Sequence, residues 1–148
     1  MRDPNGTTIM PILTYEHPML WTKLPKNTAP VAHGWLDCMW RTMYANKGIG
    51  LAANQIGWKR RVFIMKVPGG VERVFINPEI TQSSGAYVAE EGCLSFPGRF
   101  IEVERATRVE VTCHNRDMTY TIPLLGLEAR VAQHEIDHLD GIVFEQRI

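Results

Sequence analysis

The ten residues from Val131 to Asp140, VAQHEIDHLD, constrain the fold of this chain more than any other segment. They contain the pattern HExxH, in which His134 and His138 stand four positions apart and project from one face if the segment is helical. Two imidazoles on one face can chelate a divalent metal, and Glu135 can reach a water on that metal without becoming a ligand. The alternative is a solvated His-Glu-His face that binds nothing, because a pattern with three fixed positions also occurs by chance.

Two helices are predicted, one over residues 33–47 and one over residues 127–139. In the first, the apolar residues follow the i, i+3, i+4, i+7 spacing of a helix with one buried face. These residues are Leu36, Met39, Trp40 and Met43, which we expect to find in the core. Gly48 follows the first helix and Gly141 follows the second, and each is expected to adopt the left-handed conformation of a C-cap.

Two β-hairpins are also predicted. Residues 61–67 and 71–76 flank the turn Pro68-Gly69-Gly70, and residues 108–114 and 119–124 alternate apolar and polar side chains around a turn-like segment. Strands with helices at both ends favour an α+β class, with antiparallel β-sheets packed around a central HExxH helix and an N-terminal helix. We expect one domain over residues 1–148, in which residues 1–9 are a candidate extension.

The charge balance excludes some classes of function. With 16 basic and 16 acidic residues the formal net charge is +0, so no summed field attracts nucleic acid or an anionic membrane surface. The apolar runs are far shorter than the roughly 20 residues of a membrane span. The first nine residues are too polar for a signal peptide. We therefore expect a cytoplasmic protein without direct nucleic-acid or membrane partners.

A catalytic site of the zinc type usually holds three protein ligands, so the two histidines need a third. Cys93 is the favoured residue, because Gly92 before it frees the backbone to bend and lets a thiolate face a metal. Cys38 and Cys113 fall on a helical core stripe and in an alternating strand, where a small buried side chain is the better interpretation. Three cysteines without secretion features also argue against disulfides. His17, His33 and His114 lack a comparable setting.

Three segments, in this order, resemble the signature motifs of peptide deformylases. They are GIGLAANQIG at residues 48–57, EGCLS at 91–95 and QHEIDH at 133–138, and together they span most of the chain. The resemblance implies that Cys93, His134 and His138 bind the metal and that this metal is Fe²⁺. The chemistry of a thiolate and two imidazoles supports the ligand set but not iron, since Zn²⁺, Ni²⁺ or Co²⁺ would bind at least as tightly.

The implied reaction is removal of the formyl group from the N-terminal formylmethionine of nascent polypeptides, which releases formate. In it Glu135 moves the proton from the attacking water to the departing amine. The side-chain amide of Gln55 and the backbone N–H of Leu94 would donate to the formyl oxygen as negative charge develops there. Without the resemblance, Gln55 would be interpreted as a solvent-facing loop amide.

The resemblance also implies how the substrate lies. The methionine side chain enters an apolar pocket, whose matching positions here are Ile49, Leu94, Leu127, Val131 and the ring of His134. The extended peptide is expected to pair main chain to main chain with Ile49, Gly50 and Gly92. Arg105 is expected to pair with Glu91 and hold the loop that carries Cys93, although an exposed arginine is the commoner case on a strand.

The chain stops ten residues after His138, as in short, bacteriophage-encoded deformylases that lack a C-terminal helix. We therefore expect a monomer that acts on formylmethionyl peptides and nascent polypeptides, with any transient ribosome contact weakened. One alternative is an HExxH metallopeptidase, disfavoured because the third ligand candidate is an upstream Cys and no Glu or His follows at a suitable distance. The other is an inactive metal- or peptide-binding homologue, which would need neither Glu135 nor Gln55.

Overall fold

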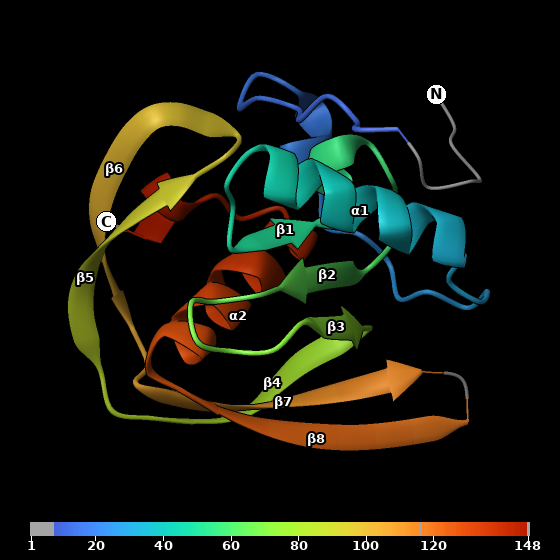
Figure 1. Ribbon diagram of the computed structural model, residues 1–148. Coiled ribbons are helices and arrows are strands. Elements are labelled where there is room, and N and C mark those ends of the chain that lie inside the picture. The colour runs from blue at the N-terminus through green and yellow to red at the C-terminus, as the bar shows by residue number, and fades with distance from the viewer. Residues whose placement is uncertain (1–7, 116, 148) are drawn as a thin grey trace.

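The computed structural model describes residues 8–115 and 117–147 (Figure 1). Its helices are η1 (Pro18–Trp21), α1 (His33–Ala45), η2 (Ala53–Ile56), α2 (Gly126–Leu139) and η3 (Phe144–Arg147), where η marks a short 3₁₀ helix. Its strands are β1 (Gly50–Ala52), β2 (Val62–Met65), β3 (Arg73–Ile76), β4 (Pro78–Ser84), β5 (Tyr87–Cys93), β6 (Phe96–Arg105), β7 (Arg108–Asn115) and β8 (Met118–Leu125). Both predicted helices and both predicted hairpins are confirmed.

The strands form three antiparallel sheets, in the orders β1-β2-β3, β4-β7-β8 and β5-β6. Helix α2 runs through the middle of the molecule, with the first sheet and α1 on one side and the second sheet on the other (Figure 1). The long β5-β6 ribbon curves around a third side. This arrangement confirms the predicted α+β class with antiparallel sheets around a central helix.

The packing explains why α2 is buried on almost every face. Ten of its fourteen residues are buried, and its apolar side chains Ala132, Ile136 and Leu139 share one core with Phe63 of β2 and Val111 of β7. A helix covered on one side only would keep a polar face in water. Because α2 is enclosed, its polar side chains must find partners inside the protein.

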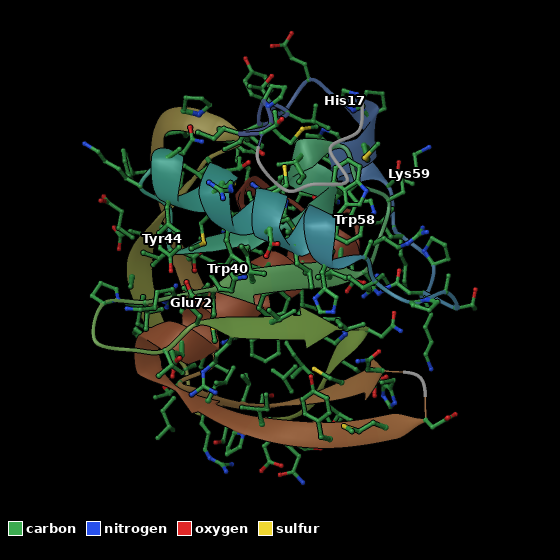
Figure 2. All side chains as sticks on the ribbon, turned by 45° about the vertical axis from the view of Figure 1, so that its right-hand side comes forward. His17, Trp40, Tyr44, Trp58, Lys59 and Glu72 are labelled. Carbon is green, nitrogen blue, oxygen red and sulfur yellow. The ribbon has the colours of Figure 1, made fainter. Side chains whose placement is uncertain are left out.

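The core on the far side of the first sheet follows the predicted stripe of α1. Met39 and Met43 are fully buried there, and Trp40 is half-buried. On the outer face, Trp40 stacks on Tyr44, whose hydroxyl donates to the Glu72 carboxylate at 2.5 Å (Figure 2). This bond ties the end of α1 to the loop between β2 and β3. Cys38 and Cys113 are both fully buried, as predicted.

The two glycine caps have different outcomes. Gly141 adopts a φ of 73° after α2, which confirms it as a left-handed cap. The prediction for Gly48 is wrong, because Lys47 takes the left-handed conformation, with a φ of 57°, and Gly48 follows it. A side chain at Gly48 would instead collide with Leu94, since a Cβ there would lie 2.8 Å from the Leu94 Cδ1 atom. Close packing, rather than backbone conformation, explains this glycine.

Four strands were not predicted: β1, β4, β5 and β6. Among the described residues, no helix is long and apolar enough to cross a membrane. Most of the candidate extension, residues 1–7, lies outside the described residues. Met10 is buried and its backbone N–H donates to the Thr42 hydroxyl at 2.9 Å, so the packed structure includes the chain from about this point.

Candidate metal centre

Three side chains of types that can bind a metal come together where β5 ends. Cys93 ends β5, and His134 and His138 lie one turn apart on α2. Their ligand atoms all lie within 4.8 Å of one another, and the Cys93 Sγ atom is 3.2 Å from the His138 Nε2 atom. Tetrahedral bonds of about 2.3 Å to sulfur and about 2.0 Å to nitrogen separate such atoms by about 3.5 Å. The donor set and its spacing therefore fit a divalent metal.

Glu91 orients the first histidine. Its carboxylate oxygen Oε1 lies 2.9 Å from the His134 Nδ1 atom. Burial, the largest influence, would raise the pKa of Glu91, but hydrogen bonds from His134 and Arg105 outweigh it and lower that pKa to about 2. An ionised carboxylate only accepts, so Nδ1 carries the hydrogen, and in the neutral ring that binds a metal the lone pair is on Nε2.

Glu91 is itself held by two buried arginines. Arg105 donates to both of its oxygens, at 2.9 and 3.0 Å, which is the pairing expected from the sequence. Arg130 adds a third bond at 2.6 Å. All three side chains are at least nine-tenths buried. Removing one partner from such a group leaves an uncompensated buried charge, which typically costs about 3–5 kcal/mol.

Glu135, next to the first histidine on α2, lines a pocket together with Cys93 and His134. It is only 4% exposed, and burial raises its pKa to about 7. A cation bound nearby would lower that pKa again by Coulombic attraction. A carboxyl group whose pKa lies near neutrality can both accept and return a proton, which is what general acid–base catalysis requires.

Gly50 makes room for this carboxylate. A Cβ built on Gly50 would lie 2.7 Å from the Glu135 Oε2 atom and 2.7 Å from the Val131 Cγ1 atom. We expect Gly50→Ala to displace Glu135 and to lower the rate constant of the catalysed reaction by about a hundredfold, a loss that a 1 Å misplacement can cause. Activity and metal content are measured together: the metal should stay, and an unchanged rate would contradict this role of Gly50.

Gln55, on η2, is fixed at both ends of its amide. Its Oε1 atom accepts from the Ala52 N–H at 2.9 Å, so its NH₂ group points to the Ser95 hydroxyl at 3.0 Å and the Cys93 Sγ atom at 3.8 Å. It is 2% exposed, unlike a solvent-facing loop amide. Leu94 lies in the turn between β5 and β6 and lines the same pocket. The role of its backbone N–H stays a prediction.

The pocket in front of the ligand atoms has a volume of about 610 Å³ and opens to solvent. All residues predicted to contact the substrate line it: Ile49, Gly50, Gly92, Leu94, Leu127, Val131 and His134. Strands β1 and β5, which contribute Gly50 and Gly92, are each at the edge of their sheet. Phe100 of β6, 63% exposed, forms a further wall by packing across Gly92, where a Cβ would lie 2.7 Å from the ring.

Several contributing residues were not predicted. Asn54 donates to the His138 carbonyl oxygen at 2.8 Å, and Ser95 accepts from Gln55. Both stand inside motifs that the sequence analysis quoted, which was the only signal for them. Arg130 and Asp137 lie on the HExxH helix, and only the contacts around that helix reveal that they belong to its buried charge network.

Comparison with known proteins identifies the same family by three routes. The family model described as Polypeptide deformylase matches residues 9–148. A peptide deformylase from Chromobacterium violaceum is 47% identical over 116 residues, covering 76% of this chain and 70% of that protein. The crystal structure of peptide deformylase from Thermotoga maritima superposes with a TM-score of 0.89 at 39% identity, covering 95% of this chain and 98% of that chain. A Met-Ala-Ser-bound class I type b peptide deformylase from Acinetobacter baumannii gives a TM-score of 0.86 at 32% identity, over 96% and 99% of the two chains.

Proposed function

Because this chain belongs to the peptide deformylase family, we propose that it hydrolyses the N-terminal formyl group of formylmethionyl peptides, giving formate and a free amine. One observation carries the proposal most strongly. Cys93 and His134 line a pocket together with Glu135 and Gln55, and the ligand atom of His138 lies within 4.8 Å of those of Cys93 and His134. The pocket thus combines metal ligands, a proton carrier and a hydrogen-bond donor in one place.

Members of this family depend on a metal, and we assign its ligands to Cys93, His134 and His138. When bound there, the ion acts as a Lewis acid that lowers the pKa of a water and polarises a carbonyl oxygen. Fe²⁺ is the proposed physiological ion, by resemblance to the family. The thiolate and two imidazoles would also accept Zn²⁺, Ni²⁺ or Co²⁺ in purified protein.

The proton transfers fall to Glu135. Its carboxylate takes a proton from the water that attacks the formyl carbon, and the C–N bond then breaks as the same carboxyl group returns the proton to the amine nitrogen. The overall reaction consumes one water and needs no other reactant. Because Glu135 is buried, the proton stays on its carboxyl group and is not lost to solvent.

Gln55 is assigned to the developing negative charge on the formyl oxygen. The bond between its Oε1 atom and the Ala52 N–H fixes its NH₂ group near the Cys93 Sγ atom, so little reorganisation is needed during the reaction. The Leu94 N–H is proposed as a second donor.

Replacing Gln55 by leucine should lower the rate constant for formate release by about a hundredfold or more, because a preorganised donor to the transition state is lost. Steady-state formate release at saturating peptide is the measurement. Gln82→Leu, at an exposed position of β4, is the matched control and should behave as wild type. Equal rates for the two variants would remove Gln55 from the mechanism.

The proposed position of the substrate follows from the two edge strands that border the pocket. An extended peptide can add to the free edges of β1 and β5 through main-chain hydrogen bonds, which read few side chains. The methionine side chain then enters the apolar part of the pocket, where an unbranched thioether adapts well to irregular walls. The relative from Acinetobacter baumannii has been solved with Met-Ala-Ser bound, which supports this class of ligand.

The test of this function is formate release from formyl-Met-Ala-Ser by anaerobically prepared, Fe²⁺-loaded protein. We expect catalytic formate release and no cleavage within an unblocked peptide. A protein that bound metal but released no formate would be the inactive homologue considered above, and internal cleavage would indicate a metallopeptidase. The single domain, the monomeric state, the weakened ribosome contact and the cytoplasmic location stay predictions.

A further inference from the structure

The short helix η3 (Phe144–Arg147) contacts the charge network behind the metal centre. The Arg147 guanidinium grips the Asp137 carboxylate with two hydrogen bonds, from Nε to Oδ2 at 3.0 Å and from Nη2 to Oδ1 at 2.7 Å. Asp137 is 6% exposed and lies between the HExxH residues Glu135 and His138 in sequence. Arg147 is neither a proposed metal ligand nor a participant in the proton transfers, so its contact with Asp137 has no role assigned above.

From Asp137 a continuous series of buried bonds leads to a proposed metal ligand. Arg105 donates to the Asp137 Oδ2 atom at 2.6 Å and, with its other two nitrogens, to both oxygens of Glu91. Glu91 in turn accepts from the His134 ring. Each member is held by its neighbours, and the Arg105–Glu91 pair is bidentate, so a shift at Asp137 is transmitted to His134 through buried bonds.

The same short helix touches His134 directly. The Phe144 ring, 2% exposed, meets the His134 ring edge to face with the centroids 5.7 Å apart. Glu145 forms an ion pair with Arg99, which lines the substrate pocket. Three residues of η3 therefore contact the proposed site or the residues that support it.

We propose that Arg147 is a positioning residue for the metal centre: by holding Asp137, it keeps Arg105 directed at Glu91 and so keeps His134 in its ligating orientation. This inference rests on the proposed metal site. Without Arg147, the Asp137 Oδ1 atom loses its hydrogen bond from the Arg147 Nη2 atom. The Asp137 carboxylate then competes with the Glu91 carboxylate for the N–H groups of Arg105. Glu91 then holds the His134 ring less firmly.

If Arg147 acted only through its charge, its removal would raise the metal affinity instead of lowering it. Removing a positive charge near a cation site would strengthen metal binding by Coulomb's law. The Arg147 side chain is 45% exposed, however, so solvent and salt screen its charge, whereas the bonds behind it are buried. Loss of orientation should therefore outweigh loss of repulsion.

The experiment measures Co²⁺ affinity by competition with a chelator, and the visible absorption of bound Co²⁺, in Arg147→Ala and Arg147→Lys. We expect affinity to fall about tenfold in the alanine variant, the lower end of the effect of residues that orient metal ligands. The lysine variant keeps the charge but not the planar fork, so it should also bind more weakly and show an altered spectrum. Arg108→Ala removes a similarly exposed arginine, paired with Glu110 and 42% exposed, and should bind as wild type.

A thermodynamic cycle tests the route through Asp137. In an Asp137→Asn background, Arg147→Ala should cause no further loss of Co²⁺ affinity, because the partner is already weakened. Thermal unfolding shows that each variant is folded during measurement, and Arg147→Lys carries the test if the alanine variant does not fold. Wild-type affinity and spectrum in both Arg147 variants would overturn the inference, as would tighter binding in Arg147→Ala. Failure of the wild-type protein itself to bind Co²⁺ would instead overturn the proposed metal site.

Discussion

Replacing Glu135 by alanine should lower formate release by about 10²- to 10⁴-fold while the protein keeps its metal, because the proton carrier is lost and the three ligands are untouched. Glu135 is buried and faces the pocket, and it is not among the three grouped ligand atoms. The measurement pairs steady-state formate release with metal analysis of the same sample. The alanine also relieves an unpaired buried oxygen, Oε1, so the folded state should not be destabilised by a lost hydrogen bond.

Two further variants sharpen this prediction. Glu135→Gln keeps the size of the side chain but cannot take up a proton, so it should be nearly as inactive as the alanine variant. Glu90→Ala removes an exposed carboxylate at the rim of the same pocket and should leave the rate almost unchanged. If Glu135→Gln retained wild-type activity, the carboxylate would have no part in proton transfer.

Replacing Cys93 by alanine should abolish stable metal binding and, with it, formate release. Zinc-finger peptides bind Zn²⁺ through four ligands with a free energy of about 10–16 kcal/mol, so one ligand contributes about 3 kcal/mol, or more than a hundredfold in affinity. Because Cys93 is the last residue of β5, next to a tight turn, and is only half-buried, its loss should leave the fold intact. Metal content after gel filtration, together with the unfolding temperature, separates metal loss from misfolding.

Cys113→Ala is the matched control for this variant. Cys113 is fully buried in the same core cluster as Val111 and is not among the proposed metal ligands. Its replacement should therefore lower stability slightly and leave the metal content unchanged. Stoichiometric metal in Cys93→Ala would contradict the assignment of Cys93. A thiolate spectrum in that variant would show that another cysteine is the third ligand, and its absence would show that no cysteine is.

Elements with a strong local pattern were predicted well. The α1 helix and the β7-β8 hairpin repeat their apolar residues at the helical and strand periods, and these periods follow from backbone geometry alone. Strands β5 and β6 carry no such pattern. Arg130 of α2 donates to Tyr87 and Glu91 of β5 and to Val103 of β6, and η3 packs on β6. These partners lie far away in the sequence, so neither strand could be predicted from its own residues.

For the HExxH segment, the sequence alone predicts how the side chains are arranged. Helical periodicity alone aligns His134 with His138 and turns Glu135 to a neighbouring face, whatever the rest of the chain does. The quoted motifs, by resemblance, also named Cys93, Gln55 and the Glu91–Arg105 pair. Only the tertiary structure decided how close these groups lie, because their separation in sequence says nothing about distance in space. It also decided that Gly50 must stay small against Glu135, and that Arg147 reaches Asp137 behind the metal site, since both depend on packing between elements rather than on any local pattern.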